Sequence, residues 1–246
     1  MAQREYYVGS LVRQIDFFAF PRTGSHFLIY CCSGLFDLIS ILPAVHRLVP
    51  EAASRQDELR PEALYALSLR EPGVPFQPVW LNTLAGGNPH GVPMKDEFPM
   101  LLLIRDPMAA VYSAWRARKR LGFPLDSAEE VQRHLEWCLH YYETGFSLLE
   151  KFPSESLLVR YEELVAAPST LEKIIGFAGV TPKLQPDFVH RVTRFDSFVN
   201  PGDRSFYREG RDTAWKDDAE WLAILSGVRE FDFSAFGYPQ ELSVAS

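Results

Sequence analysis

Hydrophobic residues along this chain fall into short runs with polar stretches between them. Four of these runs have the length and the aromatic or branched content of strands that are buried on both faces. Such strands are typical of parallel sheets, because helices cover both faces of those sheets. We therefore predict strands at Ile15–Phe20, Val79–Leu84, Met100–Ile104 and Ser156–Tyr161.

Helix signals lie between the predicted strands. Pro107 suits the first turn of a helix, and Ser127 with Glu130 three residues later forms a capping box. A long apolar segment after the first strand indicates a helix packed on the sheet. The expected helices are His26–Ile41, Pro107–Leu121, Ser127–Lys151 and Pro168–Ala178. Alternating strands and helices predict an α/β fold with a parallel sheet, in which ligands bind beyond the carboxyl ends of the strands.

Length and composition fit a single domain over residues 1–246. Hydrophobic residues make up 47% of the chain and charged residues 23%, which is enough apolar material for a substantial core. The net charge of −7 argues against a nucleic-acid partner bound through a broad basic surface. An anionic ligand would therefore need a local positive site.

Neither a membrane partner nor a disulfide framework is expected. The apolar run Phe27–Val45 contains a charged residue, a glycine and a proline, so we interpret it as buried helix, and the N-terminus has no apolar signal core. Cys31, Cys32 and Cys138 lack any metal-ligand spacing. Buried free thiols in a reducing compartment explain them best, which predicts a cytoplasmic protein.

The segment 20–27 (FPRTGSHF) follows a predicted strand and opens a predicted helix. A helix start exposes unpaired N–H groups and a positive dipole end, and Gly24 would let the backbone approach an anion closely. Arg22 adds a forked positive charge, while Ser25 and His26 add side-chain donors. The alternative is an ordinary turn with a capping serine. The segment lacks the second glycine and the Lys-Ser/Thr pair of a Walker A loop, which argues against an ordinary ATPase or GTPase.

A second anion site is predicted at the next strand end. Arg105 directly follows the strand Met100–Ile104, and Ser113 comes eight residues later in the following helix. A bend at Asp106 and Pro107 would let both side chains meet one anion. Alternatively, Arg105 pairs with Asp106 or another carboxylate, and Ser113 is simply a small helix residue.

Five segments together resemble the family of sulfotransferases that use PAPS (3′-phosphoadenosine 5′-phosphosulfate). In chain order they are FPRTGSHFL (20–28), LLLIRDPMAAVYSAW (101–115), LLVRYEELVAAPSTLEKIIGFAGV (157–180), Asp196-Ser197-Phe198, and Arg208-Glu209-Gly210 with Trp215-Lys216. The resemblance implies a three-layer, P-loop-like α/β fold with a central parallel sheet of about five strands flanked by helices. It also implies a PAPS-dependent enzyme whose product is PAP and whose scheme requires no metal.

The resemblance implies which residues of this chain bind the nucleotide. The first segment corresponds to the family's phosphosulfate loop, and the second to its 3′-phosphate motif, in which an arginine and a serine eight residues later bind the phosphate. A Ser-Phe pair contacts the adenine, and a later arginine and glycine reach the 3′-phosphate. The cofactor-binding residues expected here are Arg22, Thr23, Gly24, Ser25, His26, Phe27, Arg105, Ser113, Tyr161, Ser197, Phe198, Arg208 and Gly210.

The catalytic residues expected are Arg22, for the leaving phosphate and the transferring group, and a general base. The family's cytosolic branch has a catalytic histidine in a K-T-H segment before the arginine strand. The matching place here, Asn82–Leu84, has no histidine, and His90 is the nearest substitute. His26, or a carboxylate such as Asp96 or Glu97, is the alternative base.

The acceptor is expected to be a small, partly apolar alcohol or phenol. The irregular segments Pro43–Pro78 and Gly86–Pro99 would line its pocket, and they are rich in apolar residues. Two other functions stay open: an atypical P-loop kinase, and a non-catalytic protein that binds PAP or PAPS. The family's dimer motif is not evident in Trp215–Gly227, so the sequence leaves the oligomeric state open.

Overall fold

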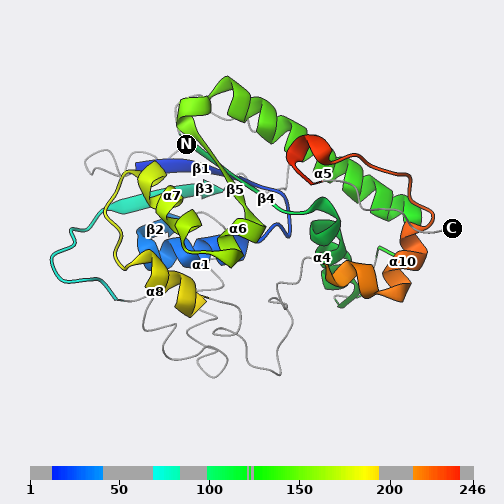
Figure 1. The fold of residues 1–246 in the computed structure, drawn as a ribbon, viewed down its shortest axis with the longest axis horizontal. Helices are drawn as coiled ribbons and strands as arrows, with labels where there is room; N and C mark the ends of the chain where they lie inside the picture. Colours follow the sequence, from blue (N-terminus) through cyan, green and yellow to red (C-terminus); the bar gives the residue numbers. More distant parts are fainter. Residues whose placement is uncertain are drawn as a thin grey trace.

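A computed structural model describes residues 13–40, 69–83, 99–120, 122, 125–193 and 213–238. Within these residues the chain forms a five-stranded sheet with helices on both faces (Figure 1). The strands are β1 (Arg13–Ala19), β2 (Asp37–Ser40), β3 (Pro78–Thr83), β4 (Met100–Ile104) and β5 (Ser156–Arg160). Their order is β2-β3-β1-β4-β5, and every neighbouring pair is parallel. This confirms the predicted α/β fold with a central parallel sheet.

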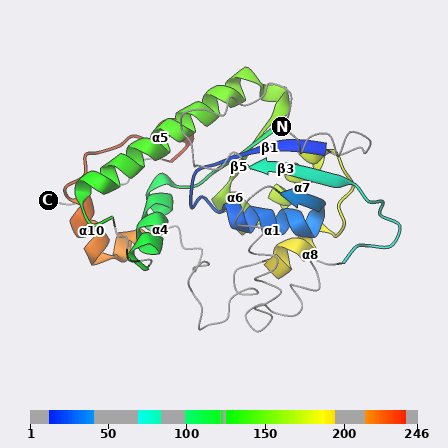
Figure 2. The same cartoon turned by 180° about the vertical axis from the view of Figure 1, so that it is seen from behind.

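Helices form a layer on each face of the sheet. One hydrophobic cluster joins the sheet to α1, α6, α7 and α8, and a second cluster joins its other face to α4, α5 and α10 (Figure 1 and Figure 2). The helices are α1 (Ser25–Leu35), α4 (Pro107–Arg120), α5 (Ala128–Lys151), α6 (Tyr161–Ala166), α7 (Ser169–Ala178), α8 (Pro186–Thr193) and α10 (Ala219–Leu225), with short 3-10 turns at Pro153–Glu155, Ala214–Asp217 and Ser234–Phe236.

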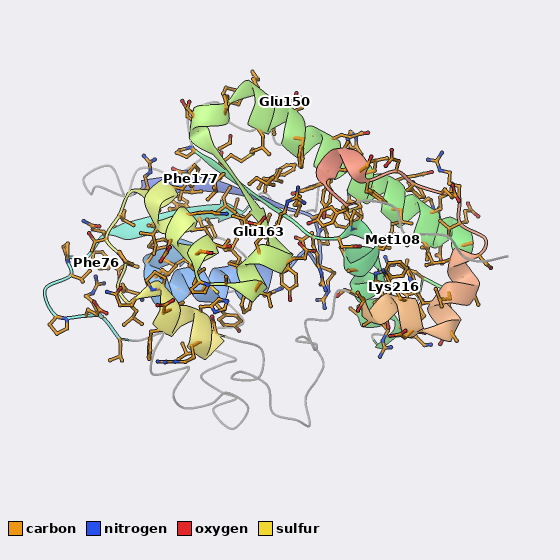
Figure 3. All side chains as sticks on the ribbon, viewed as in Figure 1. Phe76, Met108, Glu150, Glu163, Phe177 and Lys216 are labelled. Atoms are coloured by element: carbon orange, nitrogen blue, oxygen red, sulfur yellow. The ribbon has the colours of Figure 1, made fainter. Side chains whose placement is uncertain are left out.

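Strand residues alternate between the two clusters, as the period of a strand requires. Phe17 of β1 and its partner Leu101 of β4 belong to the cluster with α1. The next pair, Phe18 and Leu102, belongs to the cluster with α5. In Figure 3, side chains fill the space between the sheet and both helical layers. The labelled Glu150 marks α5 in one layer, and the labelled Phe177 marks α7 in the other. The middle strands are therefore buried on both faces.

The predicted helix over His26–Ile41 is wrong at its C-terminal end. Helix α1 ends at Leu35, Phe36 is extended (φ −127°, ψ 164°), and Asp37–Ser40 pairs with β3 as strand β2. An apolar run alone does not distinguish a buried helix turn from a short buried strand. The Asp37 carboxylate, which accepts bonds from Arg70 and from the Gln77 amide, anchors the start of this strand.

The two predicted helix-start signals, the capping box at Ser127 and the proline at Pro107, are confirmed. The Ser127 hydroxyl accepts a hydrogen bond from the Glu130 amide at 3.2 Å, and the Glu130 carboxylate accepts one from the Asp126 amide at 3.0 Å. At the start of α4, Pro107 occupies the first position, and the Asp106 carboxylate caps the helix by accepting a bond from the Ala109 amide at 2.9 Å. The second cap fixes the course of the chain directly after β4.

Two further sequence expectations concern the cysteines and membrane-spanning helices. Cys31, Cys32 and Cys138 are buried free thiols, as predicted. Burial raises the pKa of the Cys31 thiol to about 12 and raises the pKa of Cys32 and Cys138 as well. Within the described ranges, no helix has both the length and the apolar character needed to cross a membrane.

Candidate functional site: the loop after β1 and the turn after β4

The loop between β1 and α1 lies at the carboxyl end of the central strand. Arg22 and Gly24 have left-handed backbone conformations, with φ of 71° and 99°. Thr23 is fully buried, and its hydroxyl donates to the Phe20 carbonyl at 2.7 Å. Gly24 is the N-cap of α1, so the N-cap residue itself has no side chain with which to cap this helix start. The loop therefore presents uncapped first-turn amides, with Ser25 as the first helical residue instead of the cap.

Tyr161 packs directly on this loop. A Cβ atom at Gly24 would lie 2.2 Å from the Tyr161 Cδ2 atom, so only glycine fits beneath the ring. The Phe27 ring contacts the Tyr161 ring edge-on, with centroids 6.3 Å apart. The Arg105 guanidinium also lies over the Tyr161 ring, with its central carbon 4.5 Å from the ring centroid. Tyr161 thus connects the β1–α1 loop to the arginine that follows β4.

The two predicted anion sites are joined. Arg105 donates from Nη1 to the backbone carbonyl oxygen of Arg22 at 3.3 Å. Arg22 donates from Nε to the Ser113 hydroxyl, also at 3.3 Å. The Ser113 hydroxyl therefore accepts a bond from Arg22, and the predicted anion shared by Ser113 and Arg105 stays a prediction. All three side chains are partly exposed at one edge of the sheet.

His26 lies in the first turn of α1, where protonation is disfavoured. Burial is the larger cause that lowers the pKa of its imidazole below the ordinary value, and the nearby positive charge of Arg22 is the second. The imidazole is therefore held in its neutral form at neutral pH. A neutral histidine beside Arg22 and a helix start leaves a site that favours a negatively charged ligand.

Comparison with known proteins finds similar folds among solved structures. The sequence matches no family model and no curated protein. Among solved structures, it is similar to a mouse sulfotransferase complexed with PAP, with a TM-score of 0.51 and 17% identity over 86% of this chain and 78% of that chain. It is also similar to retinol dehydratase in complex with androsterone and PAP, with a TM-score of 0.50 and 16% identity over 87% and 78% of the two chains.

This chain has a sulfotransferase-like fold. In the sulfotransferase-like fold seen here, the strand order places β1 between β3 and β4, so the loop after β1 and the turn after β4 meet at one edge. The sequence resemblance and the observed strand order therefore agree on the architecture that positions the site.

The structure brings together the site residues predicted from the first two motifs and from Tyr161. Phe27 is buried in the core cluster behind the loop, where it supports Tyr161. Trp215, considered above within the last segment, is buried in the opposite cluster. The predicted residues that lie outside the described ranges are His90, Asp96, Glu97, Ser197, Phe198, Arg208 and Gly210.

Sequence reasoning missed the side chains that hold the turn after β4. Tyr142 of α5 and Glu162 of α6 bind the backbone of Arg105 and Asp106. Glu162 belongs to the RYEEL segment quoted above, but nothing in the spacing indicates its partner. Tyr142 occupies an ordinary apolar position of a long helix, so the sequence carried no signal for it. Within the described residues, no cluster of three or more potential metal ligands occurs.

Proposed function

We propose that this protein is a sulfotransferase, which transfers a sulfuryl group from PAPS to a hydroxyl of a small-molecule acceptor. The observation that chiefly supports this proposal is the bond from the Arg105 guanidinium to the Arg22 carbonyl. It places two arginine side chains at neighbouring strand ends, beside the uncapped start of α1. Two adjacent cationic groups and a row of amides suit a ligand with two anionic ends.

We assign the nucleotide to this site from the motifs, and the geometry of the two loops supports the assignment. The amides of the β1–α1 loop, with Arg22, Thr23 and Ser25, would hold the phosphosulfate end. Arg105 and Ser113 would hold the 3′-phosphate, and the Tyr161 ring would keep the Arg105 guanidinium in place. The remaining contacts rest on the sequence resemblance alone and are assigned to Ser197, Phe198, Arg208 and Gly210.

PAPS supplies a sulfuryl group on a phosphate leaving group, and the protein contributes positioning and charge stabilisation. Arg22 and the loop amides stabilise the negative charge that develops on the leaving phosphate. A general base takes the proton from the acceptor hydroxyl as its oxygen bonds to sulfur. His90 is the proposed base and His26 its rival, because the lowered pKa of His26 keeps its imidazole neutral and able to accept a proton.

The acceptor class is proposed from composition and from one similar structure. The irregular segments that would line the pocket are rich in apolar residues, and a structural relative was crystallised with androsterone. We therefore propose a small, partly apolar alcohol or phenol as acceptor. The free thiols Cys31, Cys32 and Cys138 fit a reducing, cytoplasmic compartment. The two clusters share one sheet, which supports a single domain over residues 1–246.

Calorimetric titration with PAP in the absence of magnesium tests the nucleotide assignment. We expect PAP to bind and ATP not to bind, whereas ATP binding with magnesium would favour a kinase. Release of PAP from PAPS is then followed with a panel of alcohols and phenols. Turnover with any acceptor supports the enzyme. PAP binding without turnover across the panel would favour a non-catalytic nucleotide-binding protein.

A further inference from the structure

The backbone of Arg105 is held by a side chain instead of a neighbouring strand. Pairing between β4 and β5 ends at Ile104 and Arg160. Immediately beyond it, the Arg105 amide donates to the Tyr142 hydroxyl at 2.9 Å, and that hydroxyl donates to the Arg105 carbonyl at 2.6 Å. One phenol group therefore satisfies both backbone groups of the arginine.

Tyr142 is well suited to this double role. Its side chain is fully buried between α5 and the sheet, within the cluster that includes Phe236. Burial is the largest cause that raises the pKa of Tyr142 well above its ordinary value. The hydroxyl therefore keeps its proton, which it needs in order to donate to the carbonyl while it accepts from the amide.

The next residue in the turn is held from another helix. The Asp106 amide donates to Oε1 of Glu162, at 2.8 Å. Oε2 of Glu162 accepts a bond from the Tyr238 hydroxyl at 2.9 Å. The two carboxylate oxygens thus connect the turn after β4 to the segment near the C-terminal end of the described chain. Because each carboxylate oxygen has its own partner, the orientation of the Glu162 carboxylate toward the Asp106 amide is fixed.

Tyr238 is itself held at the end of β5. The Arg160 guanidinium lies over the Tyr238 ring, 4.9 Å from its centroid, and donates to the Phe236 carbonyl at 2.7 Å. Arg160 is the last residue of β5 and pairs with Ile104 in the sheet. The support for Glu162 therefore begins at the strand that neighbours β4.

We propose that Tyr142 and Glu162 are positioning residues for Arg105. Together they fix three consecutive backbone groups, so that the arginine side chain leaves the turn toward Tyr161 and the Arg22 carbonyl. The inference rests on the proposed function, because it gives these two residues a part in binding the 3′-phosphate. Loss of either contact loosens the arginine without removing its charge.

The test compares PAP with adenosine 5′-phosphate, which lacks the 3′-phosphate, by calorimetry. Tyr142→Phe removes only the hydroxyl and keeps the buried ring. We expect it to lower PAP affinity about tenfold, as for a lost bond that leaves buried backbone groups unpaired, and to change affinity for adenosine 5′-phosphate less than about twofold. Tyr112→Phe is the matched control, because it removes another tyrosine hydroxyl bond, the one to Asp218. The control should leave both affinities unchanged.

Variants at Glu162 provide a second readout. Glu162→Gln keeps an oxygen that accepts from the Asp106 amide, so PAP affinity should stay within about threefold of wild type. Glu162→Ala removes that acceptor and should lower PAP affinity about tenfold. In an Arg105→Ala background, Tyr142→Phe should cause no further loss, because the residue that it positions is absent.

Each outcome decides the inference. An equal loss of affinity for both nucleotides would assign Tyr142 and Glu162 to general stability, and unchanged PAP affinity in both Tyr142→Phe and Glu162→Ala would also overturn the inference. A wild-type protein that binds PAP no better than adenosine 5′-phosphate would overturn it while leaving nucleotide binding intact. A wild-type protein that binds no PAP would instead overturn the proposed function, and the inference with it.

Discussion

The carbonyl oxygen of Arg22 accepts a hydrogen bond from the guanidinium of Arg105 at 3.3 Å, although 83 residues separate the two. They meet because β1 and β4 are parallel neighbours, paired as far as Ala19 and Leu103, so the chain leaves both strands at the same edge. The contact is made by a neutral carbonyl oxygen, so this contact does not itself neutralise the positive charge of Arg105. A bound anion would be stabilised by both charges at once.

The first prediction concerns Arg105. Arg105→Ala should lower PAP affinity by about 2 kcal/mol or more, because a charge-assisted bond to the 3′-phosphate is lost. That corresponds to roughly a 30-fold increase in Kd, measured by calorimetry. Arg229→Ala is the control, since this exposed arginine forms a surface ion pair with Glu136, and it should leave Kd unchanged. Equal affinities of wild type and Arg105→Ala would remove the 3′-phosphate assignment.

Much of the fold could be predicted because its signals are local. β4 begins and ends at the predicted residues, Met100 and Ile104, since a strand covered on both faces is an unbroken apolar run. The capping box at Ser127 depends only on residues of its own turn. Such features need no knowledge of distant partners, so the sequence was sufficient to locate them.

The features that escaped prediction depend on distant partners. β2 resembles a continuation of α1 until β3 is placed beside it, because the edge strand takes its conformation from its neighbour. Arg22 contacts Ser113, 91 residues away, a pairing that the sequence analysis did not propose. The bonds of Tyr142 to the Arg105 backbone join two segments 37 residues apart. No spacing rule indicates contacts of this kind.

The second prediction concerns Gly24. Gly24→Ala should destabilise the protein by on the order of 3 kcal/mol, because alanine is strained at φ 99° and its Cβ would lie 2.2 Å from the buried Tyr161 ring. Displacement of that ring would also loosen Arg105, which lies over it, so PAP affinity should fall. Urea denaturation measures the first effect, and calorimetry on the folded variant measures the second.

Alanine substitutions at two other glycines distinguish the cost of backbone strain from the cost of the steric clash at Gly24. Gly73 also has a left-handed conformation, with φ of 85°, but an added Cβ would meet no atom within 4 Å, so Gly73→Ala should cost about 1 kcal/mol. Gly176 lies within α7 with open space around it, so Gly176→Ala should stabilise by about 0.5–1 kcal/mol. A Gly24→Ala cost no larger than that of Gly73→Ala would show that Tyr161 moves aside freely.

The third prediction separates the two histidines proposed as general base. His90→Ala should lower turnover by about 100-fold or more, as expected for loss of a general base, while PAP affinity stays within about twofold of wild type. His26→Ala should change turnover much less if His90 is the base. Turnover with PAPS is measured by PAP release, and affinity by calorimetry. The reverse pattern, with His26→Ala inactive and His90→Ala active, would transfer the role to His26.

The last prediction follows from the lowered pKa of His26. Burial and then the charge of Arg22 place the folded-state pKa below the ordinary value of 6.5, so between these two values the unfolded chain binds more protons than the folded protein. Stability should therefore fall as the pH is lowered through about 6.5, and this decline should end below the folded-state pKa.

His26→Gln removes this contribution. The unfolding free energies of wild type and variant are measured in urea from pH 8 to 5. The stability of the wild type relative to the variant should decrease at low pH. The pKa of His134 is lowered as well, with burial as the largest cause, but His134 is present in both proteins and its contribution cancels in the difference. A difference that stays constant across this range would show that His26 is protonated as easily in the folded protein as in the unfolded chain.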